Sequence, residues 1–235
     1  MTIRIVTDST CDLPSEVIEE LGIKVVPLYI NIGDKGFLDG VEISRQQFYT
    51  NLPDYEMHPT TGTPGIETFL QVFDQLAEEG AAEILSIHIS ESLSATVQVA
   101  GTAAKQYRRI PVIVRDGGQL SLGTGFQVET AARMARAGKS MDEILAALED
   151  LGERTFVTAA LDTLEYLRRS GRMNRVLVGI GSLLQLKPIL TMRTGEAGSE
   201  RVRTAAKAEA RLVELLKENL PIEKFALLHT NAAEK

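Results

Sequence analysis

The sequence predicts an α/β protein of two domains. The first, residues 1–153, is expected to be a three-layer α/β/α domain with a mainly parallel sheet. Its short β-branched or apolar runs alternate with segments of helical periodicity, which is typical of parallel strands joined by right-handed helical crossovers. The pattern changes near Arg154, so residues 154–235 are expected to form a smaller two-layer α/β domain with a mixed sheet. The 235 residues, 44% of them hydrophobic, suffice for two cores.

Start and stop signals define the elements of the first domain. After a strand over 4–7, Pro14 opens a helix that Gly22 closes. Thr63 and Pro64 suit the N-cap and first position of a helix that ends at Gly80. The other expected elements are, in order, a strand over 24–32, a turn over 33–36, a helix capped by Ser44, a strand over 83–89, a helix over 93–108, a strand over 111–115, a helix over 120–137 and a helix after the capping box 140–143.

The second domain begins with a strand and then returns through a hairpin. Residues 162–165 resemble another capping box, and the basic stretch 168–172 ends the helix that follows it. Residues 193–196, Arg-Thr-Gly-Glu, suit a hairpin turn. The expected elements are a strand over 155–161, the helix ending near 172, a helix over 174–184, strands over 188–192 and 199–204, a helix to about Asn219 and a last strand over 225–229.

Composition excludes several function classes. The formal charge of -7 repels nucleic acid, so we expect no nucleic-acid partner. The longest mostly apolar run, 176–186, is far shorter than the roughly 20 residues that span a bilayer, so we expect no membrane span. The N-terminus reaches Asp8 without a secretory signal, and a single cysteine, Cys11, allows no internal disulfide. Both observations favour the cytoplasm.

Two segments end a strand-like run in small hydroxyl residues where a helix should begin. These are 60–65, Thr-Thr-Gly-Thr-Pro-Gly, and 89–96, Ile-Ser-Glu-Ser-Leu-Ser-Ala-Thr. Free N–H groups at a helix N-terminus carry partial positive charge, and hydroxyls add donors that orient an anion. The two segments therefore predict a site for a carboxylate or a phosphate.

Further polar residues are expected beside these segments. Ligands of open parallel sheets lie beyond the carboxyl ends of the strands. Besides Thr61 from a neighbouring loop, that edge would collect Asp8, Ser9, Ser90, Ser92, Ser94 and Asp116. The alternative for each residue is purely structural: Ser94 is equally suited to N-capping, and Thr61 to a turn.

Other chemistries have weaker signals. The histidines lack metal-ligand spacing, so we expect no metal, and no glycine motif for a nucleotide cofactor is present. His88 suits a buried core position, whereas His229, at the end of the last expected strand, can face an inter-domain cleft. Arg168, Arg169 and Arg172 form the densest basic cluster. They either compensate a helix C-terminus or dock a phosphate or a partner protein.

The order and spacing of several motifs resemble the DegV family of fatty-acid-binding proteins over nearly the whole chain. The blocks that carry the resemblance are Thr7–Pro14, Thr61–Pro64, Ile89–Gln98, Asp116 with Ser121–Gly123, and Leu164–Arg172 with Lys187–Ile189.

The resemblance implies a function and a set of site residues. One long-chain fatty acid would lie between the domains, its carboxylate bound by Thr61, Ser94 and the N–H of Ala95, with His229 nearby. The protein would be no enzyme itself but the lipid-binding subunit of a bacterial fatty-acid kinase. It would present the acid to an ATP-dependent subunit that makes acyl phosphate for phospholipid synthesis. Arg169 and Arg172 would help to engage that partner, and no cofactor is implied.

The sequence departs from the family pattern at four places. Ala95 and Gly62 replace a usual Gly and Ser, and Gly117 follows Asp116. The family's second domain usually continues past His229, so we expect a short variant or a fragment. Two other functions stay open. One is a stand-alone phosphotransferase related to dihydroxyacetone kinases, and the other is a regulatory interaction protein.

Overall fold

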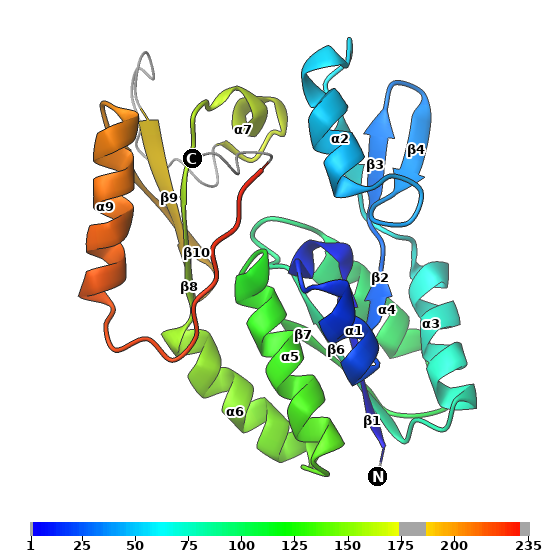
Figure 1. Ribbon diagram of the computed structural model, residues 1–235. Helices are drawn as coiled ribbons and strands as arrows, with labels where there is room; N and C mark the ends of the chain where they lie inside the picture. Colours follow the sequence, from blue (N-terminus) through cyan, green and yellow to red (C-terminus); the bar gives the residue numbers. More distant parts are fainter. Residues whose placement is uncertain (1, 174–186, 231–235) are drawn as a thin grey trace.

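A parallel four-stranded sheet organises the first domain (Figure 1). The computed structural model describes residues 2–173 and 187–230. The strand order is β2-β1-β6-β7, and all three pairings are parallel. The strands are β1 (Ile3–Asp8), β2 (Lys24–Val26), β6 (Glu83–His88) and β7 (Val112–Asp116).

Helices cover both faces of this sheet. Side chains alternate along β6, so that Leu85 and Ile87 join one core while Ile84 joins the other. The first core lies under α1 (Ser15–Leu21), α5 (Leu122–Arg136) and α6 (Met141–Arg154), and the second under α3 (Ile66–Glu78) and α4 (Thr96–Gln106). The expected three-layer α/β/α architecture is thus confirmed.

Several helix signals agree with the structure, but the start of α3 differs from the expectation. Both hydrogen bonds of the capping box at Ser140 are present, from the N–H of Glu143 to the Ser140 hydroxyl and from the N–H of Ser140 to the Glu143 carboxylate. Gly22 ends α1 in the left-handed conformation. However, α3 begins after Gly65 rather than after Thr63. Residues Thr60–Gly62 pair as strand β5, and a residue before proline disfavours the helical region, so the chain stays extended through this stretch.

A small antiparallel sheet lies above the carboxyl end of β2, where the sequence suggested one long strand over 24–32. The chain instead forms β2 and then β3 in a different sheet. Pro27 lies between them and has no N–H to continue a ladder, and the N–H of Leu28 donates to Ser9 Oγ at 3.1 Å. This sheet has the order β4-β3-β5, built from β3 (Tyr29–Ile32), β4 (Lys35–Leu38) and β5 (Thr60–Gly62), with α2 (Arg45–Asn51) and the short η2 (Leu52–Asp54) in the connection.

Among the described residues, the second domain is a sheet packed against α9, and its described strand pairings are all antiparallel, whereas a mixed sheet was expected. The order β10-β9-β8 is antiparallel in both described pairings. Ile189 of β9 packs against Ala208 and Leu215 of α9. The elements are β8 (Phe156–Ala160), α7 (Glu165–Arg169), β9 (Lys187–Arg193), β10 (Glu196–Val202) and α9 (Ala205–Glu218). The boundary expected between residues 153 and 154 stays a prediction; α6 ends at Arg154 and β8 begins at Phe156.

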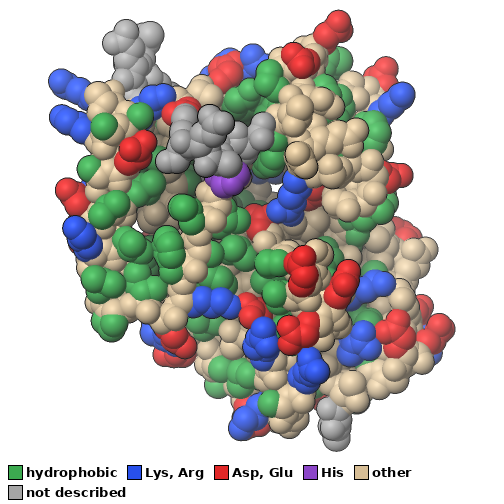
Figure 2. All heavy atoms as spheres, viewed as in Figure 1, with side chains coloured by type: hydrophobic (Ala, Val, Ile, Leu, Met, Phe, Trp, Pro, Cys, Tyr) green, Lys and Arg blue, Asp and Glu red, His purple; other side chains and the backbone are tan. Residues whose placement is uncertain are grey.

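A last strand was expected over 225–229, but this segment is not a strand in the structure. Lys224 pairs with Glu129 of α5, and Arg154 pairs with Glu223 at 2.9 Å. These ion pairs tie residues 223 and 224 to α6 and α5, and residues 225–229 follow as irregular chain. Hydrophobic side chains gather on this side of the molecule (Figure 2). The exposed large hydrophobic residues of α9 and of the chain that follows it are Val213, Leu220, Phe225, Leu227 and Leu228.

Two smaller expectations have different outcomes. Glu165 donates its N–H to Thr163 Oγ1 at 3.1 Å, but α7 begins after Leu164 and has no side-chain cap, so the capping box expected there is absent. The helix expected over 174–184 lies outside the described residues.

Candidate functional site

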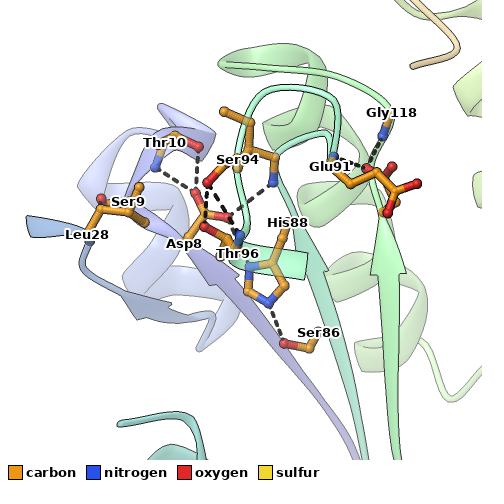
Figure 3. A network of polar contacts seen from close by, with 12 residues as sticks. Asp8, Ser9, Thr10, Leu28, Ser86, His88, Glu91, Ser94, Thr96 and Gly118 are labelled. Atoms are coloured by element: carbon orange, nitrogen blue, oxygen red, sulfur yellow. Dashed lines mark hydrogen bonds and ion pairs between the residues drawn. The ribbon is translucent and has the colours of Figure 1, made fainter. Parts of the chain in front are cut away.

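Polar loops meet at the carboxyl edge of the parallel sheet, as expected from the strand order. Asp116, at the end of β7, accepts hydrogen bonds from the N–H groups of Gly118 and Glu91 at 2.8 and 3.3 Å. Asp8, at the end of β1, accepts one from the N–H of Ile89 at 3.1 Å. The two carboxylates therefore hold the loop that follows β6 from both sides (Figure 3).

A buried network lies directly beneath that loop (Figure 3). His88 Nδ1 lies 2.9 Å from Asp8 Oδ2, and His88 Nε2 lies 2.7 Å from Ser86 Oγ. The other carboxylate oxygen, Oδ1, accepts from the N–H and the hydroxyl of Thr10 at 3.0 and 2.5 Å. Burial opposes ionisation of Asp8, but the hydrogen bonds from His88, Thr10 and Ile89 and the attraction of His88 hold its pKa below the ordinary value.

The Ser86–His88–Asp8 connectivity is that of a hydrolase triad, but its burial gives it another role. All three residues have 0% exposure, and the ring of Phe69 packs edge to face against that of His88, with 5.4 Å between the ring centroids. A nucleophile needs access to its substrate, and Ser86 has none. The structure thus confirms that His88 is a buried histidine with satisfied hydrogen bonds.

Ser94 lies at the end of the loop, just before α4. Its hydroxyl lies 2.9 Å from Thr96 Oγ1 and accepts a long hydrogen bond from the N–H of Thr96 at 3.4 Å. Its own N–H donates to the carbonyl of Ser90 at 3.1 Å. The N-cap of α4 is Ala95, which has no side-chain cap. Ser94 is therefore not the N-cap residue, and Ala95 is the residue at the positive end of this helix.

Arg172 joins the two hydroxyl segments. Its Nη2 donates to Thr61 Oγ1 at 3.2 Å, and its Nε donates to the carbonyl of Leu93 at 2.9 Å. One guanidinium thus contacts both Thr61, on the edge strand β5, and the residue before Ser94. The sequence analysis assigned Arg172 to partner docking and missed this contact, because no local signal connects residues 111 positions apart.

The other cations of the basic cluster are arranged differently. Arg168 and Arg169 both pair with Glu165, at 2.9 and 2.6 Å. Arg169 also lines a pocket of about 350 Å³ between α7 and the segment 52–59, in which the rings of His58 and Tyr166 lie 5.7 Å apart. The rest of the lining comes from Leu52, Pro53, Tyr55, Pro59, Thr163 and Glu165. Because Pro59 and Thr61 belong to one short segment, this pocket adjoins the site.

The remaining expectations concern His229, metals and membranes. His229 is exposed and lies in the irregular segment after α9, so its place beside a carboxylate stays a prediction. Within residues 2–173 and 187–230, no group of three or more Cys, His, Asp and Glu side chains could hold a metal ion. In the same ranges, no helix is both long enough and apolar enough to cross a membrane.

Comparison with known proteins places this arrangement in a family. The chain matches the DegV family, described as uncharacterised proteins, over residues 2–235. It belongs to the DegV family. A DegV domain-containing protein from Streptomyces coelicolor is 40% identical, with 91% of this chain and 75% of that protein covered. One from Listeria innocua is 35% identical, with 99% and 84% covered.

Solved DegV structures share the fold. A fatty-acid-binding DegV protein from Thermus thermophilus is 37% identical with a TM-score of 0.84, over 93% of this chain and 78% of that one. DegV from Bacillus subtilis, a fatty-acid-binding protein, is 31% identical with a TM-score of 0.85, over the same shares, 93% and 78%. The two-domain α/β architecture of this chain is therefore that of DegV proteins whose ligands are fatty acids.

Proposed function

We propose that this DegV protein binds one long-chain fatty acid between its domains. The carboxylate is held by the hydroxyls of Thr61 and Ser94 and by the N–H of Ala95, with His229 beside it. Relatives at 31 and 37% identity that bind fatty acids support the ligand class. A single buried free cysteine, Cys11, is compatible with a reducing compartment, and we propose that the protein acts in the cytoplasm.

The contact of Arg172 with Thr61 is the observation that carries the proposal. It brings a guanidinium and a hydroxyl donor to the loop that ends at the N-terminus of α4. An anion placed there meets a partial positive charge from the helix and a full one from Arg172. Only a negatively charged head group benefits from both.

The apolar tail supplies most of the affinity in this proposal. Burying about 14 methylenes at roughly 0.8 kcal/mol each contributes on the order of 11 kcal/mol before the costs of association. A hydrogen bond to a charged group contributes about 1.5 to 3 kcal/mol. The head-group residues therefore serve mainly to orient the carboxylate.

We further propose that the oriented carboxylate is a substrate for a separate, ATP-dependent kinase subunit. One carboxylate oxygen would attack the γ-phosphorus, forming an O–P bond as ADP leaves. Hydroxyl donors leave more electron density on that oxygen than a direct bidentate arginine clamp would. Arg169, at the edge of the pocket next to Thr61, is the residue that we propose docks the partner.

Calorimetric titration with palmitate tests the proposal. Ser94→Ala and Thr61→Ala should each weaken binding by about tenfold, the loss expected for one hydrogen bond to a charged group. Thr102→Ala is a matched control, because the Thr102 hydroxyl lies exposed on α4 and bonds only to the carbonyl of Gln98 at 2.8 Å. Unchanged affinity in both site variants would refute the site. If the purified protein formed acyl phosphate from ATP and palmitate without a partner, the proposal of a separate kinase subunit would be refuted.

A further inference from the structure

A chain of hydrogen bonds runs from the buried Ser86–His88–Asp8 network to the backbone of Ser94. Asp8 Oδ2 lies 2.9 Å from Nδ1 of His88 and accepts a hydrogen bond from the N–H of Ile89 at 3.1 Å. The next residue, Ser90, is fully buried and accepts the N–H of Ser94 at 3.1 Å. Ile89 and Ser90 are joined by a peptide bond, so the position of Asp8 helps to fix the turn that ends at Ser94, together with the N–H of Ser90, which donates to the carbonyl of Gln119 at 2.8 Å.

The proton positions in this network follow from the acceptors. Asp8 is ionised, because its carboxylate accepts several hydrogen bonds that hold its pKa below the ordinary value against the effect of burial. An ionised carboxylate has no proton to give, so His88 Nδ1 must carry the hydrogen. Ser86 Oγ lies 2.7 Å from Nε2, and the Nδ1–H hydrogen bond to Asp8 is present whichever of these two atoms donates.

Packing alone does not explain a histidine at this position. The rings of Phe69 and His88 pack edge to face, and an apolar side chain at position 88 would fill the same space. A buried imidazole carries a desolvation cost that only its hydrogen bonds offset. Without the Nδ1–H donor, Asp8 would lose its hydrogen bond to the imidazole and keep only those from Thr10 and Ile89.

We infer that His88 is a positioning residue for the head-group site. Through its Nδ1–H it fixes the carboxylate of Asp8, which fixes Ile89 and thereby the orientation of Ser94. His88 touches no ligand and acts only through this chain. The inference rests on the proposed function, namely that Ser94 binds a carboxylate.

Two amide variants separate the two nitrogens of the ring. In His88→Asn the amide nitrogen occupies roughly the place of Nδ1 and keeps a donor for Asp8. In His88→Gln the amide reaches the place of Nε2, so that the contact with Ser86 persists and the donor to Asp8 is lost. A residue that only filled space or stabilised the core would not distinguish the two amides by ligand chemistry.

The readout is the affinity for palmitate divided by that for methyl palmitate, because this ratio isolates the head group from the tail. We expect His88→Asn to keep the ratio within about twofold of wild type and His88→Gln to lower it about tenfold, the effect of one charge-assisted hydrogen bond. Equal ratios in the two variants, whether both low or both unchanged, would overturn the inference. A wild type that does not discriminate, or Ser94→Ala with an unchanged ratio, would instead overturn the proposed function.

A measurement on the wild type keeps the inference testable if a variant does not fold. With ¹⁵N-labelled histidine, the Nδ1 resonance of His88 should show an attached proton in slow exchange. Palmitate should shift this resonance, and methyl palmitate should shift it less. A proton on Nε2 alone, or equal shifts with the two ligands, would overturn the role of His88.

Discussion

Replacing Arg172 with Ala should weaken fatty-acid binding through electrostatics. The Arg172 guanidinium donates to Thr61 Oγ1 at 3.2 Å, so in the proposed complex this hydroxyl would lie between the guanidinium and the ligand carboxylate. The charge would then be about 6 Å from the carboxylate, since a second hydrogen bond spans the remaining distance. With an effective dielectric constant of about 20 to 40 for this half-buried side chain, the attraction is roughly 1.4 to 2.8 kcal/mol. The dissociation constant should rise by about tenfold to hundredfold.

Titration calorimetry with palmitate at low and high salt measures this effect. Arg172→Lys keeps the charge, so its affinity for palmitate should fall only about threefold, because a lysine cannot make both of the guanidinium's hydrogen bonds. Arg168→Ala is the matched control, since Arg168 lies on α7, which ends at Arg169 shortly before Arg172, has 61% of its side chain exposed and is paired with Glu165. High salt should weaken palmitate binding by the wild type more than palmitate binding by Arg172→Ala, because salt screens the charge of Arg172. Full affinity of Arg172→Ala, or an equal loss in Arg168→Ala, would refute the electrostatic reasoning.

Three further predictions concern the tail, the core and the buried carboxylate. Shortening the acid from 16 to 12 carbons should cost about 3 kcal/mol of binding free energy, and equal affinity for both acids in the same titration would exclude a buried tail. Leu148→Ala, at a fully buried position in α6, should lower the free energy of unfolding in urea by about 2 to 5 kcal/mol. The exposed Val213→Ala should change it by less than about 0.5 kcal/mol. Because the folded-state pKa of Asp8 is lowered, its contribution is complete above the unfolded value of about 3.9 and is lost as pH falls through the folded pKa. Asp8→Asn should flatten this part of the stability curve, below the unfolded pKa of an aspartate, and an unaltered curve would contradict the assignment.

The sequence predicted the parallel sheet and its helices because their signals are local and mutually consistent. Phe69, Phe73 and Leu76 recur at helical spacing, and the structure buries all three. The errors occurred where tertiary pairing decides the outcome. Pro27 divides an apparently continuous strand between two sheets, and the apolar run at 225–229 does not pair with a sheet edge. An apolar run indicates burial or pairing but does not name the partner.

Part of the candidate site was also predictable. Asp8, the loop around Ser90 and Asp116 meet because the carboxyl ends of parallel strands share one edge, and the alternation along β6 indicated that His88 is buried. The contact between Arg172 and Thr61 was not predictable in this way. Both residues lie outside the parallel sheet, so its strand order sets no distance between them.

Native mass spectrometry of the purified protein tests the central claim most directly. The account predicts a complex heavier than the chain by the mass of one long-chain fatty acid. Denaturation should release this ligand, and Ser94→Ala should reduce its occupancy. A protein that has only the mass of its chain, and gains none after incubation with a mixture of long-chain fatty acids, would contradict the claim.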